Sequence, residues 1–342
     1  MMLNNFNPSG YALKNGNLIG LPFDASNAKV VLLPVPWEAT VSYAAGTAQG
    51  PKNILDASYQ LDLYDADIPY AWRLGIYMMA TSPVIQDMSE TARNFAVRHI
   101  DNLEQGVKSV PKLIKQVNEY SHKLNNWVYI QSKRILEKGQ FLGLVGGEHS
   151  CPYGYIKALG EKHAEFGILQ IDAHCDLRKA YEGFEHSHAS IFYNVLEDIP
   201  SVKKLVQVGV RDYCEEEVNY QLQHSDKITL FSDQMIKENI YQNKSFHNIC
   251  EAIIATLPEQ VYISFDIDGL DPKLCPNTGT PVPGGFQLEE VFYLIKLLVN
   301  KGKKIIGFDL CEVGSASEWD GNVGARALYK LCNWMGKSQG LV

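Results

Sequence analysis

Short runs of apolar and β-branched residues recur along this chain, separated by stretches with the residue spacing of helices. The runs are apolar throughout instead of alternating, which is typical of strands covered on both faces. They span residues 30–33, 141–145, 166–171, 205–210, 228–231, 261–265 and 304–308. Helical patterns lie between them, for example at 126–138, 152–161 and 288–301. This alternation predicts an α/β fold around a largely parallel sheet.

The organisation of the chain favours a single domain. No repeat or low-complexity linker divides its 342 residues, and the 46% that are hydrophobic can bury one large core. We expect the domain at 30–336, with an N-terminal tail at 1–29 and a C-terminal tail at 337–342. We interpret the mostly helical segment 81–140 as an elaboration packed on the sheet. Its 101–132 portion is equally a candidate for oligomer contacts.

Composition limits the partners of the protein. A formal net charge of −8 with dispersed Lys and Arg argues against nucleic-acid binding. No run of about 18 apolar residues is present, so no membrane span is expected. The N-terminus, rich in Asn and Gly, lacks the pattern of a secretory signal. Seven cysteines occur singly and without a Cys-x-x-Cys pair, which favours a reducing cytoplasm over a disulfide framework.

Polar clusters follow three of the expected strands, at the edge where open parallel sheets bind ligands. They read Gly-Gly-Glu-His-Ser at 146–150, Asp-Ala-His-Cys-Asp at 172–176, and Asp-Ile-Asp-Gly-Leu-Asp-Pro at 266–272. Taken singly, each has a simpler explanation as a turn, a solvated strand end or a helix cap. Taken together, they predict one functional site.

The spacing within these clusters favours metal binding. Residues two apart in a strand point the same way, so Asp172, His174 and Asp176 can share a face, as can Asp266 and Asp268. Clustered carboxylates repel one another unless cations compensate them. Carboxylate and imidazole ligands without thiolate suit Mn²⁺ better than structural zinc. Cys175, at the odd position, is expected to turn away into the core. The candidate ligands are His149, Asp172, His174, Asp176, Asp266 and Asp268.

The three clusters, in this order, resemble the signatures of the arginase/agmatinase (ureohydrolase) family. Segments 34–51 and 279–285 are similar to the family as well, so the resemblance covers roughly residues 30 to 335. It implies a three-layer α/β/α sandwich and, commonly, trimers or hexamers. It also implies two Mn²⁺ ions, with Asp172 and Asp266 bridging. One ion would be held by His149, Asp172, Asp176 and Asp266, and the other by Asp172, His174, Asp266 and Asp268.

The resemblance also implies residues for the chemistry. His188, in a Ser-His-Ala-Ser stretch, matches the family's proton-carrying histidine, and an imidazole pKa suits that role. His186 stays a rival, and a solvated loop histidine is the alternative for both. Glu312 matches the glutamate that pairs with a guanidinium, for which a carboxylate can accept two parallel hydrogen bonds. A surface glutamate is its alternative. Asp268 could additionally orient the intermediate.

The implied activity is hydrolysis of a small guanidino compound. Segments 176–178, 181–183 and 187–189 resemble agmatinases more than arginases, which favours cleavage of agmatine to putrescine and urea. Departures at Asn277 and Gly314 keep other substrates open, namely guanidinobutyrate, guanidinopropionate, free guanidine with Ni²⁺, and formiminoglutamate. A non-catalytic regulatory protein of this fold and a deacylase are alternatives of other classes.

Overall fold

A computed structural model describes residues 6–107 and 110–342 of the protein. Its centre is one sheet of eight strands in the order β2-β1-β3-β8-β7-β4-β5-β6, with every neighbouring pair parallel. The strands are β1 Val30–Val35, β2 Ile76–Met78, β3 Phe141–Gly146, β4 Phe166–Ile171, β5 Val202–Val208, β6 Ile228–Phe231, β7 Gln260–Asp266 and β8 Lys304–Cys311. The predicted parallel α/β fold is therefore confirmed.

Each of the seven apolar runs corresponds to a strand, with ends shifted by a few residues. The run expected at 205–210 begins earlier, at Val202, and ends at Val208, because Gly209 leaves the extended region with a φ of 95°. The eighth strand, β2, was not predicted. It has three residues at the sheet edge, too few for periodicity to reveal.

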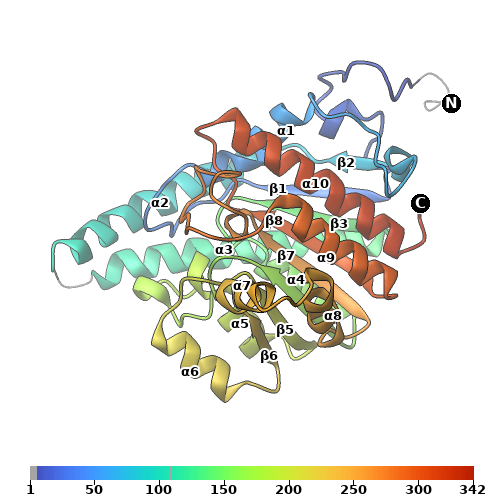
Figure 1. Cartoon of the computed structure of the whole chain (residues 1–342). Coiled ribbons are helices and arrows are strands. Elements are labelled where there is room, and N and C mark those ends of the chain that lie inside the picture. The colour runs from blue at the N-terminus through green and yellow to red at the C-terminus, as the bar shows by residue number, and fades with distance from the viewer. Residues whose placement is uncertain (1–5, 108–109) are drawn as a thin grey trace.

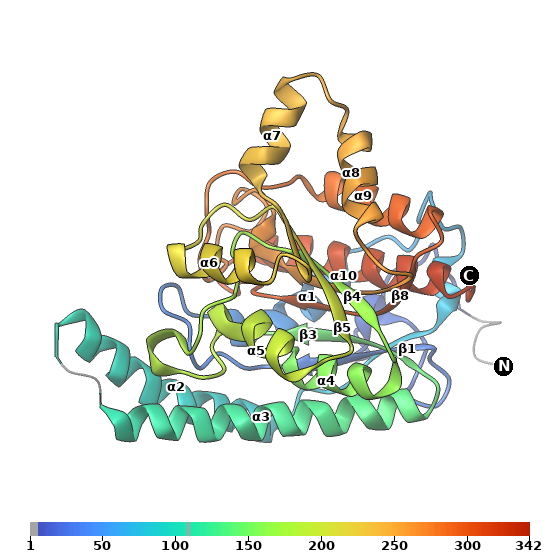
Figure 2. The same ribbon diagram turned by 90° about the horizontal axis from the view of Figure 1, so that it is seen from below.

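Helices cover both faces of the sheet, as Figures 1 and 2 show. Residues of α1, α8, α9 and α10 share one buried apolar cluster with the sheet, and residues of α2, α3, α4 and α5 share another. This is the three-layer sandwich that the family resemblance implied. The helices are α1 Gly50–Ser58, α2 Pro83–Glu104, α3 Pro111–Glu137, α4 Tyr153–Lys162, α5 Ile191–Asp198, α6 Glu215–Gln223, α7 Asp233–Tyr241, α8 Phe246–Ala255, α9 Leu288–Asn300 and α10 Glu318–Ser338.

The segment 81–140 forms two long helices, α2 and α3, which run side by side and extend past the end of the sheet (Figures 1 and 2). Both helices begin with a proline at the first turn, where its missing N–H costs nothing. Apolar residues of both helices pack on the sheet side. The interpretation as a helical elaboration agrees with this arrangement.

Part of the expected N-terminal tail is packed in the core. Leu18, Ile19 and Leu21 are buried. The Asn17 amide donates to the carbonyl of Ile76 at 3.0 Å, and its Oδ1 accepts from the amide of Met78 at 2.8 Å. These bonds seal the outer side of β2. Within residues 6–107 and 110–342, no helix combines the length and the apolar character needed to cross a membrane.

Candidate metal centre

The ends of three strands bring the six predicted ligands together. His149 follows β3, whereas Asp172 and Asp266 stand at the ends of the paired strands β4 and β7. His149 Nδ1 lies 3.0 Å from Asp172 Oδ2 and 3.3 Å from Asp266 Oδ2. Asp176 Oδ2 lies 2.9 Å from the same nitrogen. Four of the predicted ligands thus converge on one point.

A second group adjoins the first. His174 Nδ1 lies 3.0 Å from Asp268 Oδ2 and 3.6 Å from Asp172 Oδ1. Asp172 therefore belongs to both groups. The ligand atoms of His149, Asp172 and Asp266 lie within 4.8 Å of one another, and so do those of Asp172, His174 and Asp268. This arrangement fits a bridging carboxylate. The second bridging ligand that the sequence implied, Asp266, uses its Oδ1 to accept from the Asp268 amide at 2.9 Å, so that role stays a prediction.

The chemistry of the first group calls for a cation. His149 Nδ1 is buried and accepts no hydrogen bond from the described residues, whereas Nε2 lies 2.9 Å from the hydroxyl of Ser264 and can donate to it. That tautomer leaves the Nδ1 lone pair facing three carboxylates. Burial, and next the negative charges of Asp268 and Asp172, raise the pKa of Asp266 well above its usual value. Divalent ions would relieve this repulsion, so the residues present fit a binuclear metal site.

A chain of glutamines braces the shared ligand. The Gln170 side chain donates to Asp172 Oδ2 at 2.8 Å. Gln207 of β5 is paired with Gln170 of β4 and donates to Gln170 Oε1 at 2.7 Å. Gln221 in turn donates to Gln207 Oε1 at 2.7 Å. All three amides point their N–H groups toward the carboxylate. The chain therefore fixes one oxygen of Asp172 and stabilises its negative charge.

Gln170 and Gln207 belong to a row of residues that are paired across neighbouring strands, here called the bracing row. The row continues on the other side of Gln170. Gln170 is paired with Ser264 of β7, and Ser264 with Asp309 of β8. Asp309 Oδ2 accepts from the hydroxyls of Ser264 and Tyr262, each at 2.7 Å. Because the Ser264 hydroxyl donates its proton to Asp309, it can only accept a hydrogen bond from His149 Nε2. This bond fixes the orientation and the tautomer of the His149 imidazole. None of these row residues was predicted from the sequence.

Glu312 lies directly after β8 and is buried. Its φ of 62° is unusual for a residue with a side chain, and such strain is typical of functional sites. Oε1 accepts from the His149 amide at 2.9 Å, whereas Oε2 is buried and has no hydrogen-bond partner among the described residues. A Cβ at Gly279 would lie 3.0 Å from Oε2. Burial, and next the charge of Glu148, raise the pKa of Glu312 well above its usual value.

His188 borders a cavity beside the second ligand group. Thr40 Oγ1 accepts from the His188 amide at 3.0 Å, lies 3.1 Å from Glu148 Oε2, and lies 3.2 Å from His188 Nδ1. Because a carboxylate can only accept, Thr40 donates its proton to Glu148 and receives the Nδ1 proton of His188. Nε2 is then the free base. Burial is the largest cause that lowers the pKa of His188 to about 3, and the positive charge of Arg93 lowers it further.

The cavity has a volume of about 130 Å³, and most of the residues that line it are polar or charged. Its lining residues are Ser42, His174, Asp176, Arg178, Tyr181, His188, Ala189, Asp212, Glu217 and Thr280. The rival histidine, His186, is not among them. Its ring centroid lies 4.9 Å from the rings of both His122 and Tyr153. The structure thus brings His188, and not His186, to the cavity.

Two residues near the predicted ligands have structural roles. The guanidinium of Arg211 donates to the backbone carbonyls of Gly209, Asp268, Leu270 and Val282. It therefore braces the segment that carries two of the predicted metal ligands. Cys175 is buried, and an amide hydrogen of Gln221 points at its sulfur from 3.2 Å.

The two departures from the family pattern are packed against each other. The backbone and side-chain amides of Asn277 donate to the buried Asp320 carboxylate at 2.9 and 2.8 Å. A Cβ at Gly314 would lie only 2.0 Å from the Asn277 carbonyl oxygen. Only glycine fits there, so the three residues form one unit beside the segment that carries Glu312.

Comparison with known proteins is consistent with this site. The Arginase family model matches residues 28–335. An N(1)-aminopropylagmatine ureohydrolase from Synechocystis is 31% identical, over 92% of this chain and 91% of the relative, and an agmatinase from Pyrococcus horikoshii is 30% identical over 85% of each. The crystal structure of agmatine ureohydrolase of Thermoplasma volcanium has a TM-score of 0.72 at 22% identity, covering 99% of this chain and 98% of that one. The chain belongs to the arginase family and is a metal-dependent amidinohydrolase with a binuclear site for divalent ions.

Proposed function

We propose that this enzyme hydrolyses agmatine to putrescine and urea. The observation that carries the proposal is the unpartnered, buried Oε2 of Glu312, whose other oxygen is bonded to the backbone of the metal-ligand candidate His149. A guanidinium supplies the planar N–H donors that such an oxygen needs. Relatives named agmatinase support this choice of substrate.

A second substrate is N(1)-aminopropylagmatine, after which several relatives are named. Its aminopropyl group lengthens the amine end of the molecule, so the additional amine would lie farther from the guanidinium and from the metal site. Asp212 is exposed in the wall of the cavity and could receive an ammonium group there. Both substrates share the guanidinium and the amine chain, so the same residues would act on either.

We propose Mn²⁺ at both metal positions, with Ni²⁺ as the alternative. His149, Asp172, Asp176 and Asp266 would hold one ion, and Asp172, His174, Asp266 and Asp268 the other. When bound, two such ions polarise a shared water molecule and lower its pKa toward neutrality. The chain's own task is to place the guanidinium carbon beside that water and to move protons.

Glu312 and His188 divide this task. Glu312 binds the guanidinium through Oε2, because Oε1 is already used by the His149 amide. His188 carries the proton that the departing amine nitrogen requires. Its lowered pKa keeps the imidazole neutral at rest, so that Nε2 is free to accept a proton and pass it on. Asp268, a ligand first, could also orient the tetrahedral carbon.

We further expect a cytoplasmic homo-oligomer, a trimer or hexamer, as the family resemblance implies. Light scattering of the purified protein measures the oligomeric state directly. A monomer at micromolar concentration would contradict this expectation.

The test of function is a product screen on the metal-stripped protein after addition of Mn²⁺ or Ni²⁺. Urea, ammonia and formamide are measured with agmatine, N(1)-aminopropylagmatine, guanidinobutyrate, guanidinopropionate, guanidine and formiminoglutamate. We expect urea and putrescine from agmatine, with Glu312→Gln as the impaired control. Formamide from formiminoglutamate, or ammonia from guanidine, would reassign the substrate. No turnover of any compound would support the non-catalytic or deacylase alternatives.

A further inference from the structure

The loop that carries His188 has a strained backbone. Ala180 and Glu182 have φ values of 50° and 55°, in the left-handed region that residues with side chains rarely adopt, and Gly183 follows at 86°. Such a conformation persists only where the surroundings hold it. The surroundings here are the two helices α2 and α3, which form the helical hairpin of Figures 1 and 2.

The hairpin makes hydrogen bonds to the strained backbone itself. His99 Nε2 of α2 lies 2.9 Å from the Glu182 carbonyl and can donate to it. Asn118 of α3 uses both ends of its amide. Its Nδ2 donates to the Gly183 carbonyl at 3.4 Å, and its Oδ1 accepts from the Glu185 amide at 3.0 Å. Asn118 therefore clamps the loop on either side of one residue, Phe184.

Phe184 anchors the loop in the hairpin. Its side chain is fully buried, and it shares a small apolar cluster with Ala96, Ile100 and Val117 from the two helices. The fit is close on the neighbouring residue as well, because a Cβ at Gly183 would lie 2.9 Å from the Ile114 side chain. His186 extends the same contact, with its ring against His122 of α3.

The hairpin also holds the partner of His188. Ser89 of α2 accepts from the Glu38 amide at 2.8 Å, and Arg93 of α2 donates to the carbonyls of Ala39 and Val41. These residues flank Thr40, whose hydroxyl contacts both the amide and the ring of His188. One peripheral element thus binds both loops that meet at the imidazole.

We propose that the α2–α3 hairpin is the positioning element for His188, acting through Asn118 and His99 on loop 180–188. The inference rests on the proposed function, because it takes His188 to be the proton carrier. Asn118 and His99 do not line the cavity, so they are positioning residues. Their effect is to keep the imidazole within reach of the departing amine.

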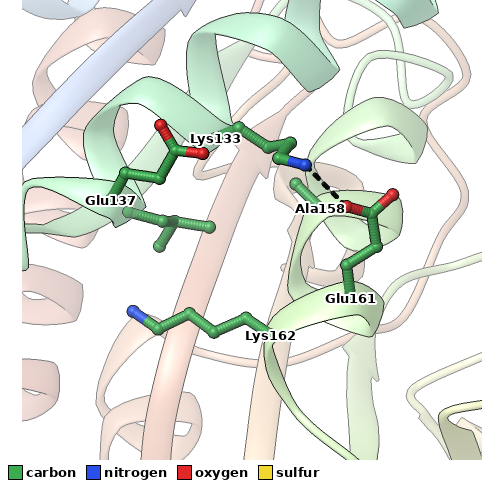
Figure 3. Close-up of a pocket in the computed structure, with 6 residues that line it drawn as sticks. Lys133, Glu137, Ala158, Glu161 and Lys162 are labelled. Atoms are coloured by element: carbon green, nitrogen blue, oxygen red, sulfur yellow. Dashed lines mark hydrogen bonds and ion pairs between the residues drawn. The ribbon is translucent and has the colours of Figure 1, made fainter.

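The test replaces Asn118 and compares it with a control on the same helix. Lys133 pairs with Glu161 of α4 at 2.9 Å, across a separate hollow of about 280 Å³ that contains none of the predicted site residues (Figure 3). We expect Asn118→Ala to lower kcat roughly 10- to 100-fold, because small displacements of a reacting group cost about that much. KM and metal content should stay within about twofold. Lys133→Ala should leave kcat within about twofold.

Two further measurements separate positioning from general destabilisation. In a His188→Ala background, Asn118→Ala should cost less than about threefold, because the group it positions is already gone. Hydrogen exchange of the amides of residues 182–185 should be at least about tenfold faster in Asn118→Ala and unchanged in Lys133→Ala. Asn118→Asp, which keeps the acceptor for the Glu185 amide, should recover part of the loss in kcat.

The outcomes are distinguishable. Equal losses from Asn118→Ala with and without His188, or unchanged exchange of residues 182–185, would overturn the hairpin proposal. If the wild type released no urea from any guanidino compound while exchange responded as expected, the proposed function would fail and the hairpin would remain the element that orders this loop. If Asn118→Ala did not fold, Asn118→Asp and His99→Gln would carry the same comparisons.

Discussion

The metal-ligand edge and the His188 loop meet at one cavity but are held in different ways. The ligands sit at or just beyond strand ends in the middle of the sheet, and a buried row of side chains on the adjacent strands braces them. The His188 loop lies outside the sheet and depends on a hairpin whose hydrogen-bonding residues lie 65 to 83 positions away in the sequence. The predicted metal ligands are thus supported by the central sheet, whereas the proposed proton carrier lies on a loop.

The energetics of the loop explain why it needs the hairpin. Each residue held in a sparsely populated backbone region costs about 1 to 3 kcal/mol, and Ala180 and Glu182 are two such residues. Burial of Phe184 contributes about 2 to 3 kcal/mol, and each hydrogen bond adds about 1 kcal/mol. The contributions nearly balance without a surplus. Loss of a single hairpin contact should therefore loosen the backbone of the loop, whereas the backbone at the strand ends should stay ordered after similar changes.

The largest effect should come from the ligand that belongs to both metal groups. Asp172→Asn removes a charge from each group, so we expect loss of both ions. The fall in kcat should be on the order of a thousandfold or more, because the water that the metals activate would return toward its ordinary pKa of about 16. Urea release and metal content by mass spectrometry measure this. Asp271→Asn is the matched control, since Asp271 lies in the polar cluster that contains Asp266 and Asp268 but pairs with Lys273. Retention of two ions by Asp172→Asn would show that the bridging assignment is wrong.

A smaller effect is expected at Glu312, which we propose binds substrate and not metal. Glu312→Gln keeps the shape and the acceptor for the His149 amide but removes the charge. A hydrogen bond to a charged group contributes about 1.5 to 3 kcal/mol, so kcat/KM for agmatine should fall roughly 10- to 100-fold. Metal content should be unchanged, in contrast to Asp172→Asn. Unchanged kcat/KM would remove Glu312 from the substrate site.

The sequence predicts the metal-ligand edge better than the loop for a physical reason. Asp172 and Asp266 stand at the ends of apolar strands, as the strand rule predicts. The spacing of two assumes extended backbone and holds less well, because Asp268 lies in a 3-10 turn and Asp176 has a φ of 55°. The residues that brace the ligands also have a sequence signal, although it is a weaker one and was not used in the prediction. Gln170 and Ser264 are polar residues inside otherwise apolar strands, each two positions before a ligand and therefore on the same face.

The role of the bracing row could not be predicted from the sequence. Gln170 finds Gln207 on one side and Ser264 on the other only because β4 lies between β5 and β7. That strand order joins segments about 40 and 90 residues apart in the sequence. The hydrogen bonds from the hairpin to residues 182–185 likewise join two segments that are far apart in the sequence. The spacing of apolar residues, which predicts helices and strands, does not predict such contacts. Local patterns thus predict ligands, and topology decides what supports them.

The bracing row gives a third prediction. Gln170→Leu should weaken metal binding about 10- to 100-fold, because residues that orient a ligand typically contribute that much. The fold of the sheet should persist, since leucine suits a buried strand. Gln221→Leu changes the far end of the same chain and should have a smaller effect. Calorimetric titration of metal-stripped protein with Mn²⁺ measures both. Equal losses in the two variants would mean that the chain acts through packing and not through Asp172.

The smallest effect concerns acid stability and compares His186 with the metal-site histidines. Burial, and next the charge of His122, lower the pKa of His186 to about 4. The unfolded chain, with an imidazole pKa near 6.5, then binds a proton that the folded chain does not. The resulting stability is complete above about pH 6.5 and is lost as the pH falls toward 4. For this partly exposed ring we expect a contribution of about 1 to 2 kcal/mol.

Metal-free protein should be unfolded with urea at pH 7.5 and 5, so that loss of metal cannot add to the difference. His186→Gln should lose less stability between these two values than the wild type. If His186→Gln and the wild type lost equal stability between pH 7.5 and 5, the acid sensitivity would come from the metal-ligand edge and not from His186.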